Sequence, residues 1–401
     1  LPAETLSLTD SAATTAANEV ILPAETLSLT DSATTTAANI VVLPTETIGL
    51  ADTVSATSGK IVDLPTETLS LTDSVSTLSI LFPDDWNKKV LSTNSTMVSG
   101  LSNLSNFSVL VTLTSDSDLS TSKVGSSGQG IRFTSDGTTL LDYEIEKYTG
   151  DANSGTLVAW VEIPTLDYDE RTLFYIHYGQ TSSPDMQDAH GTWGNYTHVY
   201  HLGEVGDGTA NEYQNSAADT NHGQGGSGAP LGYTTPSRVT GKIGYAQDFG
   251  VGDKDTEAFI DVGTVNTDFS EALTISFWSY WDDPDGGVAN KNNDQWWSRI
   301  LDFGQGPYND NIVVAHKRNT DKWNFSVFVG GTSSVSFNPS SPVIPHQEWV
   351  YATFSHFTNG TVALFINGEK VASDTYAGRP ADVSRDKSYI GLSNWHSSTP
   401  D

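Results

Sequence analysis

A phrase of 21 residues is repeated four times at the start of this chain. Its copies begin at Leu1, Leu22, Leu43 and Leu64, and each contains a Leu-Pro pair, a Glu two residues after the Pro, alternating apolar residues and an Asp. A unit this short cannot bury an apolar face by itself. Tandem copies at a fixed phase therefore predict stacked units, an extended stalk, or strands lent to neighbouring molecules.

Two apolar groups in each repeat predict short strands. Leu6 and Leu8 in the first copy would share one face of a strand, as would their counterparts in the other copies. A second apolar group, Val20-Ile21 in the first copy, comes just before the next Leu-Pro. The Ala-, Thr- and Ser-rich stretch between the two groups has little helical periodicity. We therefore expect residues 1–81 to form four tandem 21-residue β-strand repeats.

Composition excludes several classes of function. The chain has 401 residues, enough for two or three domains, with 19 Lys and Arg against 49 Asp and Glu and a net charge of -30. This charge repels nucleic acid and anionic membranes, so we expect no nucleic-acid partner. No cysteine is present, which excludes disulfides and thiolate metal sites. No apolar run approaches the roughly 20 residues of a membrane span, so none is expected in this chain.

The rest of the chain reads as strands separated by turns. Apolar runs at 109–113, 157–161 and 173–178 predict a β-sandwich over residues 82–190. Runs at 258–262, 273–278, 349–354 and 361–366 predict a two-sheet jelly roll over residues 191–401. Asn367-Gly368 after the last of these runs predicts a tight hairpin turn. The expected fold class is all-β: short strand repeats, then a β-sandwich, then the jelly roll.

Three phrases in the last region carry a family resemblance. They are Gly241–Ala246 running into Phe259–Val262, then Leu273–Trp278, then Glu348–Val350 through Phe365–Val371. In order and spacing they resemble the laminin-G-like, concanavalin A-like jelly-roll family found in many secreted proteins. That family closes with a further strand after a phrase similar to Tyr389–Leu392, and this sequence ends before one. The resemblance implies that a neighbouring chain, or the repeats, supply the last strand, or that the sequence is part of a longer protein.

Residues 82–190 carry a second resemblance. The phrases 109–113, Ile131–Glu146 and Phe174–Gly179 are similar to a microbial domain of unknown function that often directly precedes such a jelly roll. The combination implies an exported structural or adhesive surface protein of archaea or bacteria, and the Glu-Thr-Leu-Ser-Leu-Thr-Asp-Ser repeats look like those of archaeal surface proteins. The resemblance does not imply any enzymatic reaction.

Two kinds of chemistry follow from the jelly-roll resemblance. Some members are glucanases that use a Glu-x-Asp-x-x-Glu-like arrangement of carboxylates on one strand. The sequence has no such phrase, so we expect no enzymatic activity. Others bind calcium at the sandwich rim through hard oxygen ligands. Asp253, Asp255 and Glu257 alternate in a predicted loop and are the candidate calcium ligands, although the family's Phe-Asp-Gly phrase is replaced here by Phe249-Gly250.

Aromatic side chains suggest a carbohydrate site, because flat rings stack on the apolar faces of sugars. Those at expected loops or strand ends are the candidates, whereas Trp278, Trp349 and Trp160 lie inside predicted strands and are expected in the core. The candidates are Trp281, Trp296, Trp297 and Trp395. Six Asn-x-Ser/Thr sequons are candidate glycosylation sites: Asn94, Asn103, Asn106, Asn195, Asn324 and Asn359.

Three functions remain open from the sequence. The first is an extracellular surface protein that assembles with copies of itself into a filament or sheath by pairing of β-strands between subunits. The second is a stalked adhesin whose jelly roll binds cell-surface or extracellular glycans. The third, a glycan-active enzyme, has no supporting motif.

Overall fold

The computed structural model describes residues 86–395, except 227–233, 251–257, 267–268, 270–271, 282–296 and 318–319. It also gives the backbone of six short strands between residues 11 and 63. The chain divides into two compact units, residues 1–77 and 78–401.

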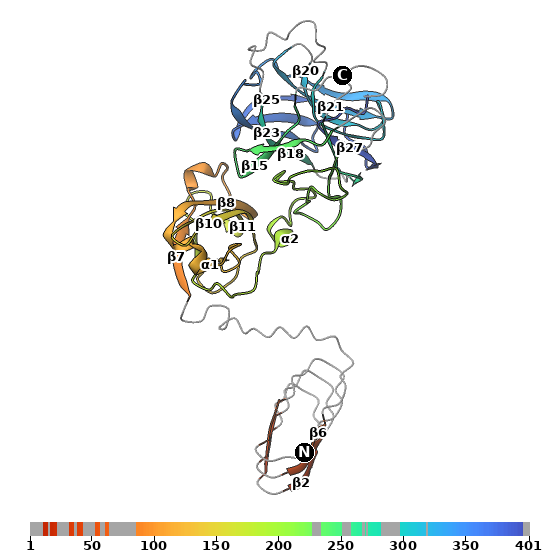
Figure 1. Cartoon of the computed structure of the whole chain (residues 1–401). Helices are drawn as coiled ribbons and strands as arrows, with labels where there is room; N and C mark the ends of the chain where they lie inside the picture. Colours follow the sequence, from red (N-terminus) through yellow and green to blue (C-terminus); the bar gives the residue numbers. More distant parts are fainter. Residues whose placement is uncertain are drawn as a thin grey trace. The chain divides into compact units, whose positions relative to one another are not determined.

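The repeats form two parallel sheets of three strands each (Figure 1). Ser11 pairs with Ser32 and Ser32 with Thr53, so equivalent positions of successive repeats lie side by side, 21 residues apart. The described strands thus show stacking. Val20-Ile21 lies in a strand as predicted, whereas Leu6 and Leu8 lie outside the described residues. The strands are β1 (Ser11–Thr14), β3 (Ser32–Thr35) and β5 (Thr53–Ala56) in one sheet, and β2 (Ala17–Ile21), β4 (Ala38–Val42) and β6 (Ile61–Asp63) in the other.

The middle domain consists of two three-stranded antiparallel sheets around one core. Strand β11 shows how the core forms, because every second residue from Leu157 to Ile163 is buried and its neighbours are less so. One sheet has the order β10 (Tyr143–Gly150), β11 (Gly155–Leu166), β8 (Leu104–Asp116), and the other the order β7 (Asn87–Ser92), β12 (Leu173–Tyr178), β9 (Arg132–Thr134). The described helices are short: α1 (Thr121–Val124), α2 (Ala189–Thr192) and the 3₁₀ turns Ser95–Met97 and Ser117–Leu119.

The segment after residue 190 is bound to this middle domain. The Trp193 indole donates a hydrogen bond to Glu144 Oε2 (2.6 Å), and Ser216 Oγ donates one to Glu144 Oε1 (2.7 Å). His201 lies between two carboxylates, with Nε2 2.9 Å from Glu144 Oε2 and Nδ1 3.2 Å from Glu146 Oε2. Burial by itself lowers the pKa of His201, but these two hydrogen-bonded partners outweigh it and raise the pKa to about 9.

The jelly roll has a seven-stranded and a four-stranded sheet. Their facing sides enclose a core in which Trp323, Phe325 and Phe354 are almost fully buried. The larger sheet has the order β13 (Gln224–Gly225), β16 (Ile260–Asp261), β27 (Lys387–Ile390), β19 (Arg299–Gly304), β20 (Ile312–Lys317), β21 (Lys322–Val329), β22 (Thr332–Phe337). The smaller has the order β18 (Leu273–Tyr280), β23 (Trp349–His356), β24 (Thr361–Ile366), β25 (Glu369–Thr375). Two short pairs, β14 (Ser237–Thr240) with β15 (Tyr245–Asp248) and β17 (Val265–Asn266) with β26 (Ser384–Arg385), complete it.

The hairpin predicted at Asn367-Gly368 is confirmed. These two residues connect β24 to β25 and both have positive φ, 50° at Asn367 and 87° at Gly368. Two positive φ values in a two-residue loop give the backbone twist that joins antiparallel strands. Among the described residues the regular secondary structure is nearly all strand, so the all-β fold class is also confirmed.

Candidate functional site

Four aromatic side chains gather on the outer face of the four-stranded sheet. Strand β18 alternates, with Leu273, Ile275 and Phe277 toward the core and every second residue from Thr274 to Tyr280 exposed. The neighbouring strand β23 buries Val350, Ala352 and Phe354, which turns the residues between them outward. We call the outward group Trp278, Tyr280, Trp349 and Tyr351 the aromatic strip.

The strip is built by strand register. Trp278 is paired with Tyr351 and Tyr280 with Trp349, with ring centroids 5.2 Å and 5.4 Å apart. Cross-strand aromatic pairs at this spacing hold one another in place. The Trp278 side chain is 36% exposed and Tyr280 is 42% exposed. One ring of each pair is therefore exposed on the sheet, and its partner, Tyr351 or Trp349, is partly buried beside it.

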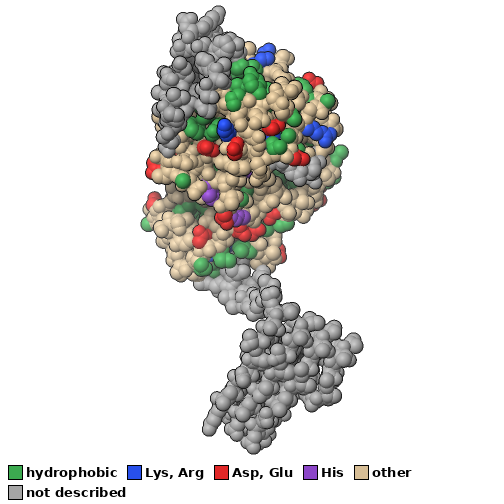
Figure 2. Space-filling view, turned by 90° about the vertical axis from the view of Figure 1, so that its right-hand side faces the viewer, with side chains coloured by type: hydrophobic (Ala, Val, Ile, Leu, Met, Phe, Trp, Pro, Cys, Tyr) green, Lys and Arg blue, Asp and Glu red, His purple; other side chains and the backbone are tan. Residues whose placement is uncertain are grey.

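Polar groups surround these rings. Lys242 Nζ lies 5.5 Å from the centroid of the Trp278 ring. Farther along the same two strands, Thr274 and Ser355 share a hydroxyl hydrogen bond of 3.1 Å. Figure 2 shows that on one face of the molecule charged and hydrophobic side chains are scattered among a larger area of other side chains and backbone. An aromatic strip with hydroxyls and the Lys242 cation beside it is suited to a ligand with apolar ring faces and polar edges.

The tryptophans singled out from the sequence lie elsewhere. Trp395 is 7% exposed and packs on Val313 and Ala315, with Arg299 5.3 Å from its ring centroid. Trp297 is partly buried against the same cluster. The Trp281 ring lies 4.5 Å from that of His316 and packs against the jelly-roll core. Burial therefore gives Trp395 a packing role, and Trp296 lies outside the described residues.

The aromatic strip corrects the expectation that Trp278 and Trp349 belong to the core. A signal for it was present in the sequence. Thr274 and Ser276 occupy the positions of β18 that alternate in phase with Trp278 and Tyr280, and hydroxyl residues at these positions mark the solvent face. Trp278 was expected in the core because it lies inside a predicted strand, but this alternation places it on the outer face.

The six sequons occupy different environments. Asn94, Asn103, Asn106, Asn195 and Asn359 are exposed. Asn324 is 1% exposed, and its Nδ2 donates hydrogen bonds to Ser326 Oγ and Asn338 Oδ1, both 3.0 Å away. The folded domain has no room for a glycan on Asn324, so the glycosylation hypothesis is restricted to the other five.

The predicted calcium ligands Asp253, Asp255 and Glu257 lie outside the described residues. Within the part of the chain that the structure describes, no group of three or more His, Cys, Asp or Glu side chains is arranged to hold a metal ion. Calcium binding therefore stays a prediction from the sequence. The same part of the chain contains no helix long and apolar enough to cross a membrane.

Comparison with known proteins gives two family matches. Residues 254–400 match the concanavalin A-like lectin/glucanases superfamily. Residues 127–215 match a domain of unknown function, DUF2341, and this region extends past residue 190 into the segment that carries Trp193 and His201. No curated protein matches the chain.

Solved structures resemble the chain at low identity. The carbohydrate binding module CBM66 from Bacillus subtilis is 11% identical, with a TM-score of 0.23, and the match covers 39% of this chain and 88% of the module. Sheep galectin-11 is 10% identical, with a TM-score of 0.23, and 32% of this chain and 91% of the galectin are covered. The binding domain of Paraclostridial mosquitocidal protein 1 is 11% identical, with a TM-score of 0.30 and coverage of 48% and 49%. Scores this low carry no functional argument. From the family matches, the chain contains a DUF2341 domain followed by a concanavalin A-like jelly-roll domain.

Proposed function

We propose that the jelly roll is a glycan-binding module of an extracellular surface protein, and that the aromatic strip is its binding site. The observation that carries the proposal is the two cross-strand ring pairs, in which the exposed Trp278 and Tyr280 lie beside the partly buried Tyr351 and Trp349. Their spacing of two residues along a strand is about 7 Å, which suits contact with a sugar chain rather than with a single small molecule.

Binding fits this surface better than cleavage. Glycoside hydrolysis requires two carboxylates on either side of the scissile bond. The strip, and the outward residues Thr274, Ser276 and Thr353 on the same two strands, include no carboxylate. The family description, which covers lectins as well as glucanases, supports a sugar ligand of either kind.

A glycan array followed by calorimetry with the strongest ligand tests this proposal. Trp278→Ala and Tyr351→Ala should each weaken binding at least tenfold, because each removes one ring of a stacking pair. Tyr308→Ala is the matched control, since Tyr308 is exposed but lies outside the strip. Equal affinity of wild type, Trp278→Ala and Tyr351→Ala for the array ligand would rule out the strip as the site.

A second candidate function concerns the repeats. We propose that they assemble the protein into a filament by continuing their strand stacking between molecules, because parallel in-register strands 21 residues apart offer equivalent edges for pairing. Electron microscopy of the full chain at high concentration, with calcium present, tests this. Ordered fibres that disappear when residues 1–77 are removed are the expected result, and isolated particles would contradict it.

A further inference from the structure

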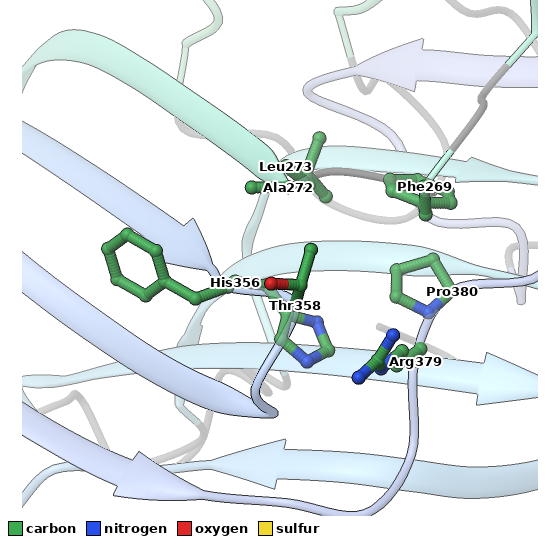
Figure 3. A pocket seen from close by; sticks show the side chains of 8 residues that line it. Phe269, Ala272, Leu273, His356, Thr358, Arg379 and Pro380 are labelled. Atoms are coloured by element: carbon green, nitrogen blue, oxygen red, sulfur yellow. The ribbon is translucent and has the colours of Figure 1, made fainter.

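A hollow at the rim of the jelly roll borders a buried histidine. Its walls include Phe269, Leu273, His356, Arg379 and Pro380, and it encloses about 190 Å³ of empty space together with its mouth (Figure 3). His356 pairs with Leu273 at one end of β18 and β23, whereas the aromatic strip lies toward the other end of these strands. The hollow is therefore a separate feature from the strip.

His356 has no hydrogen-bond partner. The residue is 3% exposed and its ring contacts Phe325 in an edge-to-face arrangement, with centroids 6.2 Å apart. Neither Nδ1 nor Nε2 has a partner. Buried polar groups in folded proteins are nearly always hydrogen-bonded. The imidazole of His356 is therefore available to form a hydrogen bond with a group that enters the hollow.

The described residues that line the hollow carry one positive charge. The exposed Arg379 is the one charged residue among the described residues that line it. Burial, and then the Arg379 charge, lower the pKa of His356. Next to the hollow, Arg385 lies 5.7 Å from the Phe269 ring centroid, and Asp382 accepts a hydrogen bond from the Phe269 backbone N (2.7 Å). A cation and an imidazole that can donate a hydrogen bond favour an anionic ligand.

We propose that this hollow binds the carboxylate of an acidic sugar, the uronic-acid class. The choice of a sugar rests on the proposed glycan-binding function, and the choice of a carboxylate rests on Arg379 and His356. Arg379 presents the fork of N–H donors that fits a carboxylate, and the neutral imidazole of His356 donates one further hydrogen bond. Because the hollow is small and part of its space is the open mouth, only one group of a larger glycan would reach His356.

Nuclear magnetic resonance of the His356 ring in the full chain tests the proposal, with sodium glucuronate as the probe and glucose as its neutral analogue. The dissociation constant obtained from the shift of the His356 resonances should be at least tenfold lower for glucuronate than for glucose. Glucuronate should also raise the pKa of His356, because a bound carboxylate stabilises the imidazolium. Binding should then strengthen as the pH falls. Acetate should compete, since the carboxylate is the recognised group. Arg379→Gln should weaken glucuronate binding at least tenfold, and Lys370→Gln, which removes an exposed cation elsewhere on the same sheet, should not.

Several results would overturn this assignment. They are an unchanged His356 signal with glucuronate, an equal response to glucose, or undiminished binding by Arg379→Gln. Because Arg379 is exposed, that variant should fold normally. The Trp278→Ala variant separates this proposal from the previous one. If Trp278→Ala keeps the array affinity of the wild type while His356 responds to glucuronate, the aromatic strip is wrong and the anion site stands. If Trp278→Ala loses array binding while His356 does not respond to glucuronate, the anion site alone is removed.

Discussion

His201 connects protonation to the stability of the DUF2341 domain. Its two ring nitrogens face Glu144 and Glu146, and the indoles of Trp160 and Trp193 each donate a hydrogen bond to one of these carboxylates. A buried cation that is paired on both sides is stabilised, whereas the same carboxylates around a neutral ring would lose their counter-charge. This residue therefore holds the segment after residue 190 to β10 more firmly when it is protonated.

We predict that this contribution is lost at alkaline pH. The pKa of His201 is about 9 in the folded protein against 6.5 in the ordinary state, so the stabilisation is complete below pH 6.5 and disappears as the pH rises through 9. A pKa shift of this size corresponds to a contribution on the order of 3 kcal/mol to the free energy of unfolding. Urea unfolding of the wild type should show the free energy of unfolding falling between pH 6.5 and 9, and His201→Gln should remove most of that slope. His190→Gln, at an exposed histidine, is the control; equal slopes in the wild type and His201→Gln would contradict the prediction.

His177 should make the protein less stable at acid pH, whereas His201 affects stability at alkaline pH. Burial, and then Lys88, lower the pKa of His177 to about 4. The unfolded chain binds the proton near pH 6.5 and the folded chain does not, so stability should fall as the pH drops from 6.5 toward 4. His177→Gln should lessen this acid-side loss in the same urea titration. Identical acid-side slopes in the wild type and the variant would show that other groups control it.

At the scale of single elements, the strands themselves could be predicted from the sequence but the orientation of some side chains could not. The runs 273–278 and 349–354 were both predicted as strands, and both are observed in the four-stranded sheet. Trp278 was placed on the wrong face because a tryptophan in an apolar run suits a core as well as a surface. Trp395 was predicted to be a sugar-stacking candidate at a loop or strand end, because nothing local in the sequence indicates its contacts with Val313 and Ala315 in a distant strand.

Two tryptophans should therefore respond differently to truncation. Trp395→Ala removes a buried ring and should cost about 3–5 kcal/mol of unfolding free energy. Trp278→Ala removes a ring that is 36% exposed and should cost much less, while abolishing array binding. Urea denaturation beside the binding measurement checks both. A loss of stability in Trp278→Ala as large as that in Trp395→Ala would place Trp278 back in the core.

The β24–β25 hairpin allows a test of backbone conformation alone. Gly368 has a φ of 87°, and a Cβ added there would meet no atom within 4 Å. Gly203 has the same open surroundings without a positive φ. Gly368→Ala should therefore cost about 1–2 kcal/mol of stability, whereas Gly203→Ala should be neutral or slightly stabilising. Thermal unfolding of the two variants gives the comparison, and equal effects would mean that the turn tolerates alanine.

On the scale of the whole molecule, the repeat period was readable from the sequence but its structural meaning was not. The 21-residue spacing permitted stacking, a stalk or exchanged strands, and the parallel pairing of Ser11, Ser32 and Thr53 shows that repeats stack within one chain. Strands β1, β3 and β5 lie in Ser-, Thr- and Ala-rich stretches with no strong apolar alternation. Such strands form because each one pairs with the equivalent strand of the next repeat, which provides its hydrogen-bond partners. This is a tertiary effect that the sequence of a single repeat does not reveal.

Stacking at a fixed period makes the length of a deletion more important than its composition. Removing residues 22–42 takes out one whole repeat, so the remaining copies keep their phase and the shortened unit should retain its β-sheet circular dichroism. Removing residues 22–31 takes out fewer residues but joins the end of β2 directly to the start of β3. The 21-residue spacing is then lost, so this deletion should abolish the β-sheet signal. If the repeats also join molecules, the first deletion should leave fibres visible by electron microscopy and the second should eliminate them. Fibres from both variants would mean that assembly uses a surface other than the stacked strands, while sheet signal without fibres in the first would limit the repeats to stacking within one chain.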